Sequence, residues 1–251
     1  MNDISSKNWN IIKLEETEST NLYLRQLLLD TEIEEFTTIV TDFQSGGRGQ
    51  RGNSWTSDRG QNLLFSFVVY PKNIFANEQF ILSRVVSLAL VNVLSDFTND
   101  IKIKWPNDIY WKDHKIAGIL IENNLLGKVI DSSIVGIGLN INQTSFPEFL
   151  VNPTSLSKIT GEVHDVQYLL NRFMQEFESL YANIENDKQA IEERYMHKLY
   201  RLQGYHLYKD KDGEFEAKII DVAPSGHLYL QAIYEDCQRV YAFKEVQFLN
   251  R

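Results

Sequence analysis

The stretch that decides the fold is QSGGRGQRGNSW, residues 44–55, in which glycines surround two arginines. Glycine tolerates positive φ angles and lets backbone N–H groups approach a ligand closely. Arg48 and Arg51 add two permanent cations whose planar donors match a carboxylate or a phosphate. The pattern therefore indicates an anion-binding loop, although a mobile surface turn has a similar composition.

Strands are predicted on both sides of this loop. β-Branched residues dominate 37–41 before it, and apolar residues dominate 62–69 after it. Farther upstream, residues 11–14 predict another short strand, and Ser19 or Thr20 is placed to cap a helix. The loop is thus expected to connect two strands.

The middle of the chain combines strands and helices. Apolar residues recur at helical spacing through 78–97, which predicts a core helix. Strands are expected next at 101–105, 108–111, 115–122 and 129–142, with a bend at Pro106 because proline has no N–H for a sheet. Two helices should follow. One carries an apolar stripe that is more typical of core packing than of a groove for a partner helix: Leu169, Leu170, Phe173, Phe177 and Leu180.

Beyond about residue 202 the sequence changes to short strands separated by turns. The strands predicted at 205–208, 214–222, 227–232 and 239–243 are typical of a small barrel or sandwich. We therefore place a domain boundary near residue 203, which divides the chain into residues 1–202 and 203–251.

Composition excludes several classes of protein. A hydrophobic share of 43% with 24% charged residues is that of a globular chain, and no apolar run approaches the ~20 residues that span a bilayer. The N-terminus lacks the features of a secretory signal, and one cysteine, Cys237, indicates a reducing, cytoplasmic setting. A net charge of −9 argues against a general nucleic-acid binder, whereas local clusters of lysine and arginine suit a small anionic ligand.

Two further motifs carry groups suited to chemistry. In KWPND, residues 104–108, Asp108 is a candidate Mg²⁺ ligand, yet the motif alone is also typical of a surface turn. Lys115 starts an apolar strand and could hold its ammonium over a pocket or extend it to solvent. Gly118 and the glycines of GIGLNIN, residues 136–142, would let a ligand lie against bare strand backbone. The histidines are scattered, and neither a G-x-S-x-G nor a Walker A motif is present.

These motifs occur together and in order: ESTN at 18–21, QSGGRGQRGNSW at 44–55, KWPNDIYWKDHKIAGILIE at 104–122 and GIGLN at 136–140. In this combination the chain resembles the biotin–protein ligase family, from about residue 15 to residue 142. The resemblance implies an α+β fold, in which a mixed β-sheet flanked by helices, of the class II synthetase-like biotin/lipoate ligase type, is followed by a small C-terminal SH3-like β-barrel. It also implies that biotin and ATP give biotinyl-5′-AMP and pyrophosphate, before biotin is transferred to a lysine of a biotin carboxyl carrier protein.

The resemblance also implies roles for residues that match the family motifs. Arg48 and Lys115 match the groups at the junction of carboxylate and phosphate, and Asp108 completes the implied catalytic set. Biotin binding is implied for Ser19, Thr20, Asn21, Gln44, Arg48, Gly49, Gln50, Lys115, Gly118, Gly136 and Gly138. Nucleotide binding is implied for Arg48, Arg51, Trp55, Asn107, Lys115 and Asn140. ATP with its Mg²⁺ is the implied second substrate, and no tightly bound prosthetic group is expected.

One position departs from the family pattern. Gln50 stands where many relatives carry arginine, so the loop loses a fixed charge that would help to retain the adenylate. The first motif begins at Glu18, so we expect no helix-turn-helix domain and no binding of DNA. We also expect no membrane association, a cytoplasmic location, and either a monomer or a homodimer.

Two other functions fit part of the sequence. A lipoate–protein ligase would share the catalytic fold and also modify a carrier lysine, but the intact GRGQRG and KWPND motifs favour biotin. A non-catalytic, biotin-responsive regulator would keep the pocket, but the presence of both Arg48 and Lys115 speaks against it.

Overall fold

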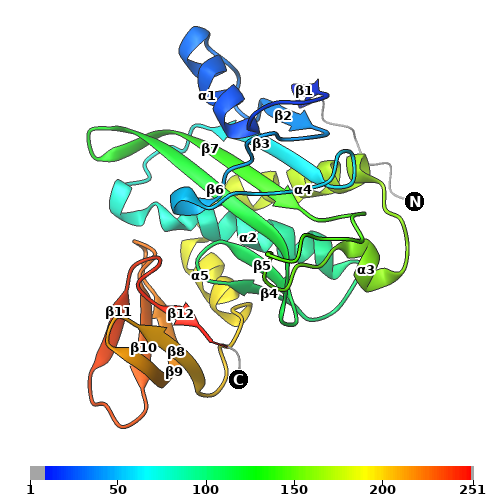
Figure 1. Cartoon of the computed structure of the whole chain (residues 1–251). Coiled ribbons are helices and arrows are strands. Elements are labelled where there is room, and N and C mark those ends of the chain that lie inside the picture. Colours follow the sequence, from blue (N-terminus) through cyan, green and yellow to red (C-terminus); the bar gives the residue numbers. More distant parts are fainter. Residues whose placement is uncertain (1–8, 250–251) are drawn as a thin grey trace. The chain divides into compact units, whose positions relative to one another are not determined.

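A computed structural model describes residues 9–249, whose backbone contacts gather into two compact units. The first unit comprises residues 9–73, 117–150 and 155–166, and the second comprises residues 74–116, 151–154 and 167–249. The chain passes from one unit to the other within strand β6 (His114–Leu126), which is labelled with the other elements in Figure 1.

The first unit is built around a mixed sheet. Its strands lie in the order β1 (Ile11–Leu14), β2 (Thr38–Thr41), β3 (Leu63–Val69), β7 (Val129–Leu139) and β6. β1 and β2 run parallel, whereas the other neighbouring pairs are antiparallel. Every residue of β3 is buried, which agrees with its nearly continuous apolar sequence LLFSFVV. A 3₁₀ turn, η1 (Gln50–Gly52), and a short helix, α3 (Leu156–Thr160), complete the unit.

Helix α1 (Thr20–Asp30) packs on this sheet. It contacts β2, β3 and β7 (Figure 1) and buries Leu24 in the core. Ser19 precedes the helix in an extended conformation, but its side chain makes no capping hydrogen bond. The amide of Thr20 donates instead to the side chain of Gln44, which precedes the glycine-rich loop. Residues 20 and 44, far apart in sequence, therefore hold each other in place.

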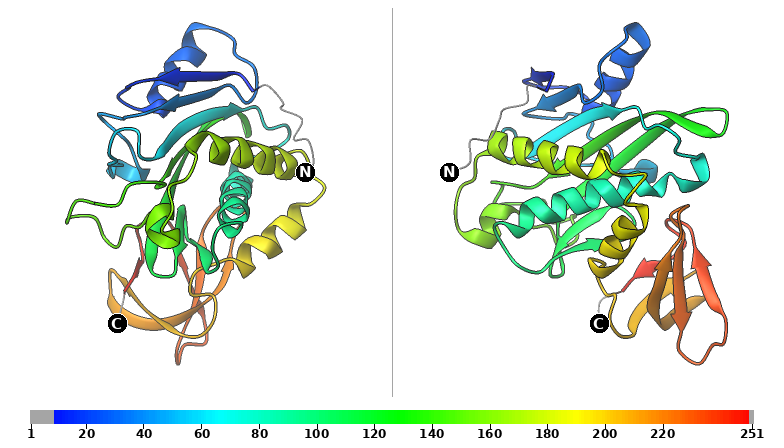
Figure 2. Two further views of the ribbon diagram at one scale, coloured as in Figure 1. Left: turned by 90° about the vertical axis from the view of Figure 1, so that its right-hand side faces the viewer. Right: turned by 180° about the vertical axis from the view of Figure 1, so that it is seen from behind.

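The second unit contains most of the helical residues of the chain. Its helices are η2 (Ala76–Glu78), α2 (Phe80–Ser95), α4 (Val166–Tyr181, apart from its first residue) and α5 (Lys188–His197). α2 is buried along nearly its whole length, and α5 lies beside it (Figure 2). Residues Ala76–Ser95 are long and apolar enough to cross a membrane by length and composition, yet 72% of the most apolar stretch is buried, as in a core helix.

Two strands of this unit flank the KWPND motif. β4 (Ile101–Lys104) and β5 (Asp108–Trp111) form an antiparallel pair, and the bend predicted at Pro106 contains a cis Trp105–Pro106 bond. Downstream, the structure has three helices where two were predicted. The additional helix, α3, has only 5 residues, too few for an apolar period to reveal it.

A second sheet lies at the C-terminal end of the described chain. It is antiparallel, in the order β11 (Gln238–Tyr241), β10 (Leu228–Ala232), β9 (Gly213–Val222), β8 (His206–Asp210) and β12 (Gln247–Phe248). Its core includes Tyr208, Leu228 and Leu230, all fully buried. The predicted fold class, a mixed sheet with helices followed by a small all-β part, is confirmed. The boundary near residue 203 remains a prediction.

Candidate active site

A group of hydrogen-bonded polar side chains lies where α1 begins beside the sheet of the first unit. We call Thr20, Asn21, Gln44, Ser66 and Glu122 the polar cluster. Ser66 Oγ lies 2.6 Å from Thr20 Oγ1 and 2.6 Å from Asn21 Oδ1. Asn21 Nδ2 donates to Glu122 Oε2 at 2.8 Å, and Gln44 Oε1 accepts from the Thr20 amide at 2.8 Å. Because each group is held by its neighbours, the cluster can offer directional hydrogen bonds to a polar ligand.

Strand β7 presents bare backbone next to the polar cluster. Gly138 pairs with Gly118 on β6, so two glycines lie side by side in the sheet. A Cβ on Gly136 would lie 2.1 Å from Asn21 Oδ1, and one on Gly138 would lie 2.3 Å from Trp55 Cε2. No ordinary Cβ contact is that short, so the side chains of Asn21 and Trp55 can approach β7 only because these positions are glycine.

Backbone hydrogen bonds hold the glycine-rich loop in a closed turn. The Gly49 amide donates to the Asn53 carbonyl at 2.7 Å, and the Trp55 amide donates to the Gly47 carbonyl at 2.9 Å. Gln50 begins the 3₁₀ turn η1 inside this loop. The loop backbone therefore positions Trp55 over Gly138.

Arg48 brings positive charge to the polar cluster. Its Nη1 lies 3.8 Å from Glu122 Oε1, and the same carboxylate oxygen accepts from Arg25 Nη2 at 2.5 Å. The Arg48 side chain is 44% exposed, so its pairing with Glu122 contributes only about 0–1 kcal/mol to stability. An anionic ligand can therefore displace Glu122 from Arg48 at little energetic cost.

The second unit pairs two residues that the sequence analysis assigned to catalysis. Lys115 Nζ, at the start of β6, lies 2.6 Å from Asp108 Oδ1, at the start of β5. The two groups are within ion-pair distance, although without hydrogen-bond geometry. Asn107 lies in the turn just before Asp108. The starts of β5 and β6 therefore bring the carboxylate of the KWPND motif and the ammonium of Lys115 together.

Lys104 lies in the same charged group. It is the cross-strand neighbour of Asp108, and its Nζ donates to Tyr110 Oη at 3.0 Å. Burial lowers the pKa of Lys104, opposed by Asp108 and assisted by the positive charges of Arg201 and Lys115. Burial likewise raises the pKa of Tyr110, with Asp108 adding to the effect, so the phenol stays protonated at neutral pH. An incoming anion would stabilise the charged form of Lys104.

The structure places the remaining predicted residues as follows. Ser19 is buried directly before α1, and Asn140 is buried directly after β7, where its carbonyl accepts from the Leu156 amide at 3.1 Å. Gly49 lies in the closed loop. The side chain of Arg51 falls outside the described part of the structure.

Sequence reasoning missed two members of the polar cluster. Ser66 is the one polar residue in the strand LLFSFVV, and Glu122 is the one acid in IAGILIE. A lone polar residue in a buried strand requires a hydrogen-bond partner. This requirement was the sequence signal that could have identified both residues as members of a polar site.

The sequence offered one candidate Mg²⁺ ligand, Asp108, but no complete set of metal ligands. Within residues 9–249 no three histidine, cysteine, aspartate or glutamate side chains gather in a way that could hold a metal ion. Asp108, the candidate Mg²⁺ ligand, is placed against Lys115.

Residues 14–140, half of the chain, match the model of the Biotin/lipoate A/B protein ligase family. The chain belongs to this family. Bifunctional ligase/repressor BirA of Escherichia coli is 34% identical over 138 residues, which cover 54% of this chain and 41% of BirA. Biotin–protein ligase 2 of Arabidopsis thaliana is 30% identical over 224 residues, covering 82% of this chain and 64% of that protein. The chain spans about half the length of the curated relatives that it matches.

Solved structures of the family extend the similarity over nearly the whole chain. A biotin protein ligase from Aquifex aeolicus, solved in complex with biotin and ATP, is similar with a TM-score of 0.78 and 26% identity. The match covers 96% of this chain and 99% of the Aquifex chain. The family fold therefore includes the C-terminal sheet as well as the region that carries the motifs.

Proposed function

We propose that the chain is an ATP-dependent ligase that activates biotin as biotinyl-5′-AMP and attaches it to a lysine of a biotin carboxyl carrier protein. The observation that carries the proposal is the polar cluster against Gly136, with Trp55 over Gly138, in a fold shared over 96% of the chain with a ligase solved with biotin and ATP. Directional polar groups beside bare backbone suit the bicyclic ring system of biotin, which is flat and apolar apart from a ureido end that forms hydrogen bonds.

We assign the two ends of biotin to different parts of the first unit. Thr20, Asn21 and Gln44 hydrogen-bond or enclose the ureido end, with Ser19 beside them. The ring system lies along β6 and β7 near Gly118, beside Asn21 and Trp55, which Gly136 and Gly138 allow to approach the sheet. Arg48 receives the carboxylate, and Trp55 lies on the adenosine side. These roles follow the family resemblance and are supported by the burial of Thr20, Asn21 and Ser66 and by the hydrogen bonds within the cluster.

The first chemical step joins two anions. One oxygen of the biotin carboxylate forms a bond to the α-phosphorus of ATP, the bond from that phosphorus to the β-phosphate bridge breaks, and pyrophosphate leaves with the electron pair. Like charges repel, so fixed cations in a partly dry site must stabilise the transition state. We assign this role to Arg48 and Lys115, with Mg²⁺ entering as part of the ATP substrate.

The second step transfers the acyl group. A neutral lysine amine of the carrier attacks the acyl carbon of biotinyl-AMP, an amide forms, and AMP leaves with the electrons of the carbon–oxygen bond. The amine loses a proton, which the released AMP or solvent can accept. Holding the acyl carbon at a fixed distance from the incoming amine supplies much of the acceleration.

Release of pyrophosphate tests the first step. The protein, MgATP and either biotin or lipoate would be incubated, and we expect release with biotin only. Release with lipoate alone would assign the chain to lipoate ligation, and release with neither would leave a ligand-responsive regulator. Labelled biotin and a carrier domain then test transfer. In the same assay, Lys115→Ala should slow the release of pyrophosphate. Lys128→Ala, which changes a lysine in the exposed turn between β6 and β7, is its matched control.

A further inference from the structure

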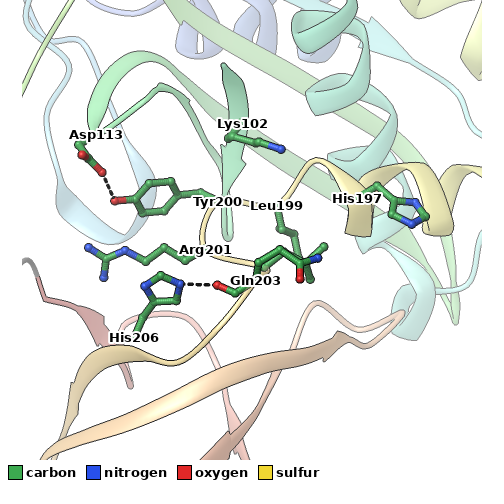
Figure 3. A pocket seen from close by; sticks show the side chains of 9 residues that line it. Lys102, Asp113, His197, Leu199, Tyr200, Arg201, Gln203 and His206 are labelled. Atoms are coloured by element: carbon green, nitrogen blue, oxygen red, sulfur yellow. Dashed lines mark hydrogen bonds between the residues drawn. The ribbon is translucent and has the colours of Figure 1, made fainter. Parts of the chain in front are cut away.

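The second unit contains a pocket apart from the polar cluster. Its volume is about 490 Å³, within the range of small-molecule sites. Figure 3 shows its lining, which comes from β4, the turn after β5, the end of α5 and the segment leading into β8. The polar and charged side chains of the lining include Lys102, Asp113, His197, Tyr200, Arg201 and His206.

The pocket carries more positive than negative charge. Lys102 and Arg201 contribute two basic side chains, against one carboxylate, Asp113. Tyr200 Oη donates to Asp113 Oδ1 at 2.5 Å, so this carboxylate already has a hydrogen-bond donor (Figure 3). Guanidinium and ammonium groups are both donors that bind phosphate groups.

Two imidazoles also line the pocket. His206 Nε2 lies 2.7 Å from the carbonyl of Gln203, and a carbonyl oxygen can only accept, so Nε2 carries a hydrogen. His197 provides the second imidazole of the lining. Both rings therefore add polar nitrogen atoms to the pocket.

The backbone of Arg201 is strained. Its φ angle is +61°, in the left-handed region that residues other than glycine adopt rarely. Arg201 Nη1 donates to the Leu249 carbonyl at 2.7 Å, and its guanidinium lies 5.0 Å from the Tyr200 ring. The left-handed backbone therefore restricts which replacements of Arg201 preserve the fold.

A line of contacts connects this pocket with the KWPND motif. Lys102 and Lys104 lie on the same face of β4, since Ile101 and Ile103 are the buried alternate residues. The Tyr110 ring, which Lys104 contacts, lies 5.5 Å from the Tyr200 ring of the pocket. Cationic side chains therefore continue from Lys115, through Lys104, to the pocket.

We propose that this pocket receives the inorganic pyrophosphate that leaves when biotin is adenylated. The inference rests on the proposed function, because that reaction is the source of the pyrophosphate. Cleavage of the α–β linkage frees a compact, highly charged anion, which needs several cations to replace its hydration. The series Lys115, Lys104, Lys102 and Arg201 leads from the motif to a space of suitable size and charge.

The direct test is calorimetric titration of inorganic pyrophosphate into the full chain, without biotin or ATP. The double variant Lys102→Gln/Arg201→Asn should bind pyrophosphate about tenfold more weakly or worse, since two charge-assisted contacts are lost. Asparagine is chosen because it tolerates left-handed backbone, which protects the fold. Arg194→Gln on α5 and Lys209→Gln on β8, both exposed in the same unit, are controls with the same change of charge.

A second measurement separates this inference from the proposed function. In the adenylation assay, the inhibition constant for pyrophosphate should rise by a similar factor in the double variant, with the KM for biotin unchanged. Equal affinity for pyrophosphate in wild type and double variant would overturn the assignment, as would orthophosphate binding as tightly as pyrophosphate. If wild type binds pyrophosphate but releases none with biotin, the proposed function fails and the binding site stands.

Discussion

Replacing Gly136 with alanine tests whether bare backbone on β7 shapes the site. The new Cβ would lie 2.1 Å from Asn21 Oδ1 and 2.9 Å from Asn21 Cγ. Asn21 cannot turn away freely, because it is only 3% exposed and is bonded to Ser66 and Glu122. One added methyl group therefore displaces a side chain held at both ends.

The size of the effect follows from that geometry. The amide oxygen must move outward by about 0.9 Å to restore a tolerable 3.0 Å contact, which breaks its bond to Ser66. A buried polar group left without its partner costs about 1–3 kcal/mol. Overpacking costs about 1–3 kcal/mol more. We expect the free energy of unfolding to fall by about 2–6 kcal/mol and the affinity for biotin to fall about tenfold or more.

Urea denaturation would measure the loss of stability, and calorimetric titration with biotin would measure the loss of affinity. The control is a double-mutant cycle with Asn21→Ala, which removes the atoms that the methyl group would strike. In that background Gly136→Ala should change stability by less than about 1 kcal/mol. An equal loss in both backgrounds, or a single variant as stable as the wild type, would refute the reasoning.

Other changes give separate expectations. Gly138→Ala should displace the indole of Trp55, which a Cβ would approach to 2.3 Å, and weaken ATP binding more than biotin binding when both are titrated separately. Lys115→Ala should slow biotin-dependent pyrophosphate release by ~10²-fold or more, and a loss below threefold would mean that its role is misassigned. Gln50→Arg should slow the escape of biotinyl-AMP, and equal release rates from the two proteins, followed with labelled biotin, would contradict this. Burial raises the pKa of Tyr195 above its usual 10.0, so the protonated phenol contributes fully to the stability of the fold below pH 10. Above pH 10 this contribution to the free energy of unfolding is lost by about 1.4 kcal/mol per pH unit. Urea titrations at several pH values should therefore show a shallower decline of the free energy of unfolding for Tyr195→Phe than for the wild type.

Much of the fold could be predicted from local pattern. The β-branched and apolar runs around the glycine-rich loop became β2 and β3, and the helical period at 78–97 became α2. The bend at Pro106 was predictable because proline cannot donate to a sheet. The short α3 was not predictable, because five residues contain little more than one helical turn.

The candidate site was predictable only in part. The glycines and cations were visible because they occur in compact motifs with unusual composition. Ser66 and Glu122 were not, because each is a single polar residue inside an apolar strand, and its partner lies tens of residues away. The pairing of Asp108 with Lys115 likewise depends on how the chain turns between β5 and β6.

The sequence by itself determined which segments become strands and helices, and which glycines and cations are available. These follow from short-range causes: side-chain periodicity, permitted φ angles and the position of proline. Tertiary structure decided that Gln44 bonds to the start of α1, that Asn21 sits over Gly136, and that a cationic pocket forms beside Tyr200. Those outcomes depend on strand register and on which distant faces are buried together, because a hydrogen bond or ion pair requires atoms to meet within about 3–4 Å.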